Sequence, residues 1–113
     1  MRLVPENRLI SEDLAKLNLI RSKYVGRMIN FSVYPPMHLF SLANDSTEFL
    51  VTNNLLSLDG WVFVVQAHYC WSMDDDRFGT ALEILVGERK FFVISWNDFQ
   101  HCNFLGESNA DCS

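Results

Sequence analysis

The sequence predicts an α+β fold in which one N-terminal helix packs on a curved antiparallel sheet of about five or six strands. Three observations favour this fold class. A helical apolar stripe lies near the start, alternating apolar and polar residues follow it, and turn-forming residues separate the alternating runs. The 113 residues contain no repeat or linker, so a single domain spanning residues 1–113 is expected.

The helix is predicted from Ser11 to Val25. The Ser11 hydroxyl precedes the run EDLAKLNLI and is expected to cap the helix, and two acidic residues follow it, where they favour the positive end of the helix dipole. Gly26 is expected to end the helix. The apolar stripe recurs at near-helical spacing and consists of Leu14, Leu17, Ile20 and Tyr24.

The next two segments predict shorter strands. The run RMINFSVY alternates between apolar and polar residues, so Ile29 is expected on an apolar face and Asn30 on a polar one. Pro35 and Pro36 are expected to end this strand. The runs MHLFSLA and EFLVTN flank the turn-forming NDST, so they are expected to form a hairpin.

A three-stranded antiparallel meander is predicted over residues 61–96. Its strands are WVFVVQAHYCW, TALEILV and FFVISW, with DDDRFG at the first turn and Gly87 supplying the positive φ of the second. Strict alternation in the first strand would place Val62 and Val64 on the face opposite Ala67. The segment NDFQHCNFL is expected to form either a short C-terminal helix capped by Asn97 or an irregular return.

The formal net charge is −5, and it is unevenly distributed. Six basic and five acidic residues precede Ser57, whereas three basic and nine acidic residues lie from Ser57 onward. An acidic surface repels phosphate backbones, so direct nucleic-acid binding is disfavoured. A basic protein partner would instead be steered toward the C-terminal half.

Asp74, Asp75 and Asp76 allow three interpretations: a solvated turn, a patch that meets a basic partner, or a metal site. Adjacent carboxylates in a loop seldom converge on one cation, and the spacing of a calcium loop is absent. Acid–base catalysis needs carboxylates whose pKa values differ through burial, which an exposed tip does not supply. The turn is therefore favoured first and the partner-binding patch second.

A second set of residues could bind zinc or form a Cys–His nucleophile pair, and it consists of His68, Cys70, His101 and Cys102. The usual CxxC or HxxxH spacing is absent, and no common catalytic motif occurs in the chain. The three cysteines are an odd number, which favours free thiols in a reducing compartment. We therefore expect a protein without cofactor or metal that is not an enzyme.

Large aromatic residues lie at or beyond the ends of the predicted strands, namely Trp71, Phe78, Trp96, Phe99 and Phe104. Interface cores favour such rings, and a ring beside carboxylates suits an Arg- or Lys-rich partner. The residues predicted to bind a partner are Asp74, Asp75, Asp76, Trp71, Phe78 and Glu83.

These features favour a small acidic immunity- or antitoxin-type inhibitor that neutralises a basic toxin acting on nucleic acid. One alternative is a phage- or mobile-element-encoded inhibitor of a host defence complex. Another is an enzyme or small-ligand binder with a pocket between helix and sheet that uses His68 and Glu83. The first residues lack the apolar run of a secretory signal, and no segment approaches the roughly 20 apolar residues of a membrane span, so a cytoplasmic protein without membrane association is expected.

Overall fold

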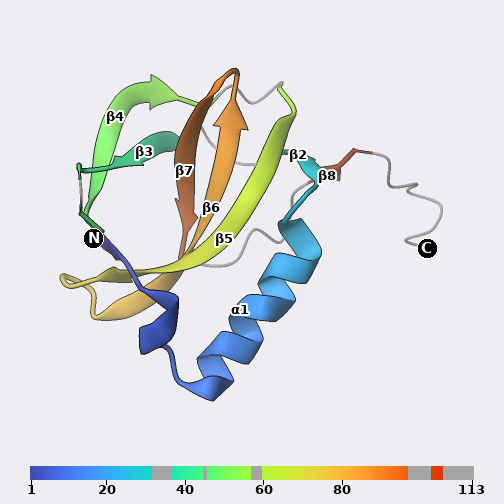
Figure 1. Ribbon diagram of the computed structural model, residues 1–113. Helices are drawn as coiled ribbons and strands as arrows, with labels where there is room; N and C mark the ends of the chain where they lie inside the picture. Colours follow the sequence, from blue (N-terminus) through green and yellow to red (C-terminus); the bar gives the residue numbers. More distant parts are fainter. Residues whose placement is uncertain (32–36, 45, 57–59, 97–102, 106–113) are drawn as a thin grey trace.

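The computed structural model describes residues 1–31, 37–44, 46–56, 60–96 and 103–105. In this part of the chain a single α-helix, α1 (Ser11–Tyr24), lies beside a curved antiparallel sheet, which confirms the predicted fold class (Figure 1). A short 3₁₀ helix (Glu6–Arg8) precedes α1. The strands are β1 (Arg2–Leu3), β2 (Met28–Asn30), β3 (His38–Leu42), β4 (Phe49–Leu55), β5 (Val62–Ser72), β6 (Arg77–Val86), β7 (Arg89–Ser95) and β8 (Asn103–Phe104).

The strands form one sheet in the order β4-β3-β7-β6-β5-β2-β8, with β1 paired to β5. The predicted meander is confirmed, because β5, β6 and β7 are consecutive antiparallel neighbours. Gly87 has a φ of +65° and forms a two-residue turn with Glu88 between the paired residues Val86 and Arg89. The predicted β3–β4 hairpin is also present. The two-residue strands β1 and β8 are too short for alternation to reveal.

Strand β1 connects two parts of the sheet that lie far apart in its strand order. Arg2 pairs with Trp71 on β5 and also forms a bridge with Glu48, just before β4. The Phe49 backbone N–H donates to the Met1 carbonyl oxygen over 3.0 Å. The sheet therefore curls toward closure at this end, around a core cluster of the buried residues Phe49, Cys70, Ala81 and Phe92.

A larger core cluster forms where α1 packs on the sheet. Leu17 and Tyr24 of α1 are buried in it, and the half-buried Ile20 packs against it, as the predicted apolar stripe required. Leu14, the fourth member of that stripe, is half-buried and belongs to neither core cluster. The strands contribute the buried residues Ile29, Phe31, Leu39, Leu56, Val62, Val64, Ala67, Leu82, Ile84, Phe91 and Val93. Burial of each large aliphatic side chain contributes roughly 1.5–3 kcal/mol, so this cluster fixes α1 against β5.

The predicted cap of α1 is wrong, whereas its predicted end is confirmed. Ile10 occupies the N-cap position without a side-chain hydrogen bond, and Ser11 is already the first helical residue. At the other end Val25 is the C-cap, and Gly26 follows with a φ of +81°. The Gly26 N–H donates to the Val64 carbonyl oxygen over 2.9 Å, so the turn after the helix is fixed directly to β5.

The strict alternation predicted for β5 is also wrong, because a β-bulge interrupts the strand between Val64 and Gln66. The extra residue changes which side chains face α1. Val62 and Val64 therefore share the helix-side core cluster with Ala67, rather than lying on the opposite face. The first half of β5 is not covered on both faces, since Trp61 and Phe63 flank Val62 and are 42% and 36% exposed.

One residue of β2 also departs from its predicted environment. Asn30 is buried rather than on a solvent-exposed polar face, and its side-chain amide donates to the Gly60 carbonyl oxygen over 3.1 Å. This bond satisfies a polar group that burial would otherwise leave without water. The predicted end of this strand at Pro35 and Pro36 lies outside the described residues. Of the C-terminal segment 97–105, only residues 103–105 are described, and there Asn103–Phe104 form strand β8 rather than part of a helix.

Candidate functional site

The three aspartates form the tip of the β5–β6 hairpin, as predicted, in a turn over residues 73–76. All three side chains are exposed. Asp76 has a φ of 51°, a left-handed conformation that aspartate tolerates better than most residues. The Asp75 N–H donates to Ser72 Oγ over 3.3 Å, and the Asp75 carboxylate lies 3.8 Å from Arg77 Nε. Hydrogen bonding thus fixes the backbone while the carboxylates face solvent.

Two of the predicted partner-binding aromatic residues lie together next to this tip. Trp71 and Phe78 pair across β5 and β6, and their ring centroids are 4.7 Å apart in a T-shaped arrangement. The ring of Tyr69 lies 6.2 Å from that of Phe78. Phe78 remains 49% exposed, so it presents an apolar surface directly beside the acidic tip.

A cavity of about 320 Å³ lies between α1 and the β5–β6 hairpin, and Phe78 forms part of its wall. The helix contributes Lys16, Leu19 and Ile20, while the sheet contributes Tyr69, Gly79 and Thr80. Trp96, the residue after β7, completes the lining. We call this space the helix–hairpin cavity.

Sequence patterns missed most of the helix–hairpin cavity, although two signals pointed to it. Leu19 lies off the apolar stripe of α1, so its sequence position predicts an exposed leucine, and it is 71% exposed beside the exposed ring of Phe78. Gly79 lies inside a strand, where glycine often marks the close approach of another group. Here that group is Trp96, whose ring also packs under the Arg77 guanidinium at 4.8 Å from its centroid.

Glu83 does not join the acidic tip. It lies further along β6, with its carboxylate 3.1 Å from His68 Nε2 and 3.5 Å from Lys90 Nζ. The side chains of His68 and Glu83 are only 22% and 16% exposed. Neither residue lines the helix–hairpin cavity. The ligand-binding alternative placed His68 and Glu83 in a pocket between helix and sheet. The structure contains such a cavity, but these two residues lie outside it.

The proposed zinc ligands are only partly described. Cys70 is completely buried, and burial raises the pKa of its thiol to about 11. A neutral buried thiol is a poor nucleophile and a poor metal ligand near pH 7. No group of three potential metal ligands occurs among the described residues. His101 and Cys102 lie outside them.

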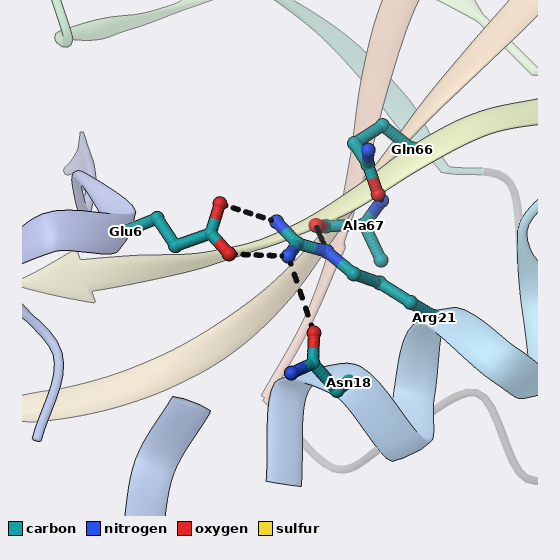
Figure 2. Close-up of polar contacts among 5 residues, drawn as sticks. All are labelled: Glu6, Asn18, Arg21, Gln66 and Ala67. Atoms are coloured by element: carbon teal, nitrogen blue, oxygen red, sulfur yellow. Dashed lines mark hydrogen bonds and ion pairs between the residues drawn. The ribbon is translucent and has the colours of Figure 1, made fainter. Parts of the chain in front are cut away.

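A polar cluster that the sequence did not predict holds α1 against the bulge of β5 (Figure 2). Arg21 Nε donates to the Ala67 carbonyl oxygen over 3.1 Å, and Arg21 Nη1 donates to Glu6 over 2.8 Å. Asn18 accepts a longer bond of 3.4 Å from the same nitrogen, and the Gln66 side chain accepts the Ala67 N–H over 3.0 Å. These bonds satisfy both backbone polar groups of Ala67 at a site where the bulge disturbs the sheet.

The Arg21 guanidinium also affects the charge state of its partner. Its hydrogen bond and positive charge lower the pKa of the Glu6 carboxyl from its ordinary value of 4.5. The cluster is structural rather than catalytic in character, because its hydrogen-bonding groups are directed at one another. By fixing α1, it positions the helical wall of the helix–hairpin cavity.

In the part of the chain that the structure describes, no helix has both the length and the apolar character needed to cross a membrane. Comparison with protein-family models, with curated proteins and with solved structures finds no match to this chain.

Proposed function

We propose that this protein is a small acidic, non-catalytic binding protein of the immunity or antitoxin type that neutralises a basic protein partner in the cytoplasm. The observation that carries the proposal is the presentation of Asp74, Asp75 and Asp76 on a backbone-fixed turn beside the exposed ring of Phe78. Among the described residues, Asp74 and Asp76 have no ion-pair partner, so their charges are available to a basic surface.

The partner best suited to this surface is a toxin domain that acts on nucleic acid. Such a domain needs a positively charged groove for phosphate groups, and exposed carboxylates can occupy that groove and accelerate association. Aromatic rings beside the carboxylates add contacts that a phosphate backbone does not offer, including stacking with arginine. The net charge of −5 favours approach to a basic protein and disfavours nucleic acid itself.

The proposal is tested with the variant in which Asp74, Asp75 and Asp76 are all changed to Asn. Wild type and variant are used as parallel baits in extracts of the cells that produce the chain, and partners lost by the variant are identified by mass spectrometry. A captured partner should be basic, and coexpression of the wild type should relieve the growth inhibition that the partner causes.

Association kinetics then distinguish electrostatic steering from other effects. At low salt the triple variant should associate about tenfold or more slowly, because steering by charge accelerates association by factors of 10–10³. The difference should shrink as salt is added, since exposed charges are screened over about 8–10 Å. Equal association rates at low salt, with the variant folded by circular dichroism, would contradict the proposal.

A further inference from the structure

We infer that the helix–hairpin cavity receives one apolar side chain, of the size of leucine, methionine or phenylalanine, from a lysine- and arginine-rich segment of the partner. This inference rests on the proposed function and specifies how the partner is recognised. The feature that carries it is the cavity, not the acidic tip alone.

Large apolar side chains are exposed at the mouth of the cavity, where a small protein would be more stable with them covered. Leu19 is 71% exposed and Phe78 is 49% exposed, and they face the same cavity from α1 and from β6. The half-buried Ile20 and Tyr69 extend this apolar lining between them. Exposed apolar patches of this kind commonly mark interaction sites, because covering them releases about 25 cal/mol per Å².

The size of the cavity limits its occupant. Its volume of about 320 Å³ lies at the lower end of the range of roughly 300–1,000 Å³ that is typical of small-molecule pockets. A cavity of this size can receive one large side chain in full. The rings of Tyr69, Phe78 and Trp96, with Leu19 and Ile20, offer that side chain a mostly apolar surface.

The charge around the cavity indicates what flanks that side chain. Among the described residues, two cations adjoin the cavity, and each has an acidic partner. Lys16 of the lining has its ammonium 3.6 Å from the Glu12 carboxylate, and Arg77, which packs on the Trp96 ring, has Nε 3.8 Å from the Asp75 carboxylate. Asp76 is the last residue of the turn and lies two residues before Phe78, so its exposed carboxylate belongs to the tip that adjoins this wall of the cavity. A basic residue one to three positions from the inserted side chain can therefore reach the tip, since an extended chain spans about 3.3–3.6 Å per residue.

The test uses three capped peptides and the ¹⁵N-labelled protein, followed by two-dimensional NMR. The basic apolar peptide is Lys-Arg-Leu-Arg-Lys, the basic polar peptide replaces its leucine with serine, and the acidic apolar peptide is Glu-Asp-Leu-Asp-Glu. The basic apolar peptide should shift the amides of Leu19, Ile20 and Thr80 together with those of the tip. The basic polar peptide should shift the tip alone and bind about tenfold more weakly, the usual loss for an unfilled apolar pocket.

Leu19→Ser tests the cavity without a cost in folding, because its side chain is largely exposed. This variant should reduce the affinity for the basic apolar peptide to that for the basic polar peptide and leave the latter unchanged. Leu50→Ser is the matched control, since Leu50 is 49% exposed on β4 and does not line the cavity. It should change neither affinity.

The outcomes separate this inference from the proposed function. If both basic peptides bind equally and shift only the tip, the cavity is not the binding site, whereas the proposal of a basic partner is retained. If the acidic apolar peptide fills the cavity as well as the basic one, the assigned occupant is wrong. If neither basic peptide binds at millimolar concentration, both the inference and the proposed function are contradicted.

Discussion

The indole ring of Trp96 lies directly on the backbone of Gly79. A Cβ atom at position 79 would come within 2.6 Å of Trp96 Cε3 and 2.8 Å of Cζ3, closer than side-chain atoms approach one another. Glycine at this position therefore creates the space that the indole occupies, and it determines how one wall of the helix–hairpin cavity is built.

This relationship predicts that the effect of Gly79→Ala depends on the side chain at position 96. In the wild type the substitution should destabilise the protein by about 1–3 kcal/mol, because the methyl group displaces the ring. In a Trp96→Ala background the cost should be clearly smaller, because only the 3.1 Å contact of the new methyl group with the Ser95 carbonyl oxygen remains and alanine loses less conformational entropy than glycine in a strand. Urea unfolding of the four proteins measures both effects. A destabilisation of the same size in both backgrounds would show that the ring is not the cause.

A second prediction concerns the bond from Arg21 to the bulge. Arg21→Met should cost about 1–3 kcal/mol, because it leaves the Ala67 carbonyl without its side-chain donor. Glu6→Gln is the matched control, since it keeps that donor and removes only the charge of an exposed partner. Thermal unfolding of the two variants should therefore show a clearly larger loss for Arg21→Met. A similar loss in both would assign the effect to the ion pair instead.

The same pair predicts a pH dependence. The pKa of Glu6 is lowered in the folded protein, so the stability from its ionised form is present above the ordinary value of 4.5. It is lost as the pH falls through the lowered folded-state pKa. The difference in stability between wild type and Glu6→Gln should therefore shrink with acidification below pH 4.5, and denaturant unfolding at a series of pH values measures it. A difference that grows in acid would contradict the assigned direction.

A further prediction follows from the burial of Cys70. In a Cys102→Ser, Cys112→Ser variant the remaining thiol should not react with Ellman's reagent at pH 8 until the protein is unfolded. Its pKa is raised from 9.0 to about 11 by burial, so its contribution to stability is complete below pH 9 and is lost as the pH rises through 11. The stability of this variant should fall in that interval relative to the same protein with Cys70→Ala. Rapid labelling of the native protein would show that the site is open.

Another prediction compares neighbouring residues before the bulge of β5. Val64 is completely buried, so Val64→Asp should cost several kcal/mol through an unpaired buried charge. Phe63 is 36% exposed, so Phe63→Asp should cost only about 1 kcal/mol. Chemical denaturation of both variants checks this order. Equal losses would mean that both faces of β5 are covered here.

Alternation and turn chemistry predicted the meander because each acts over neighbouring residues. Alternating side chains and the positive φ of Gly87 are local properties, and β6, β7 and their turn follow from them. The bulge between Val64 and Gln66 was not predictable from the alternating pattern. The residue types in the strand do not reveal it, yet the extra residue reverses the face on which every later side chain lies. The expected Ser11 cap failed because Ser11 is itself the first helical residue and Ile10 takes the N-cap position.

The candidate site was predictable only where it lies within one hairpin. Asp74, Asp75 and Asp76 and the Trp71–Phe78 pair come from adjacent segments, and their proximity follows from the turn. The helix–hairpin cavity also needs Leu19 from α1 and Trp96 from the end of β7. Those residues meet through the packing of the whole domain, which no local pattern encodes.

The position of β1 has a consequence for the order in which the fold is assembled. Arg2 and Leu3 pair with Trp71 and Cys70, residues far along the chain, whereas the β3–β4, β5–β6 and β6–β7 hairpins join neighbours. Contacts between distant residues form late, because the entropy of closing a long loop opposes them until other structure exists. We therefore expect residues 1–3 to pair with the curled sheet, and to stabilise it, only after its hairpins have formed. Leu3→Ala should accordingly accelerate unfolding and leave the folding rate nearly unchanged.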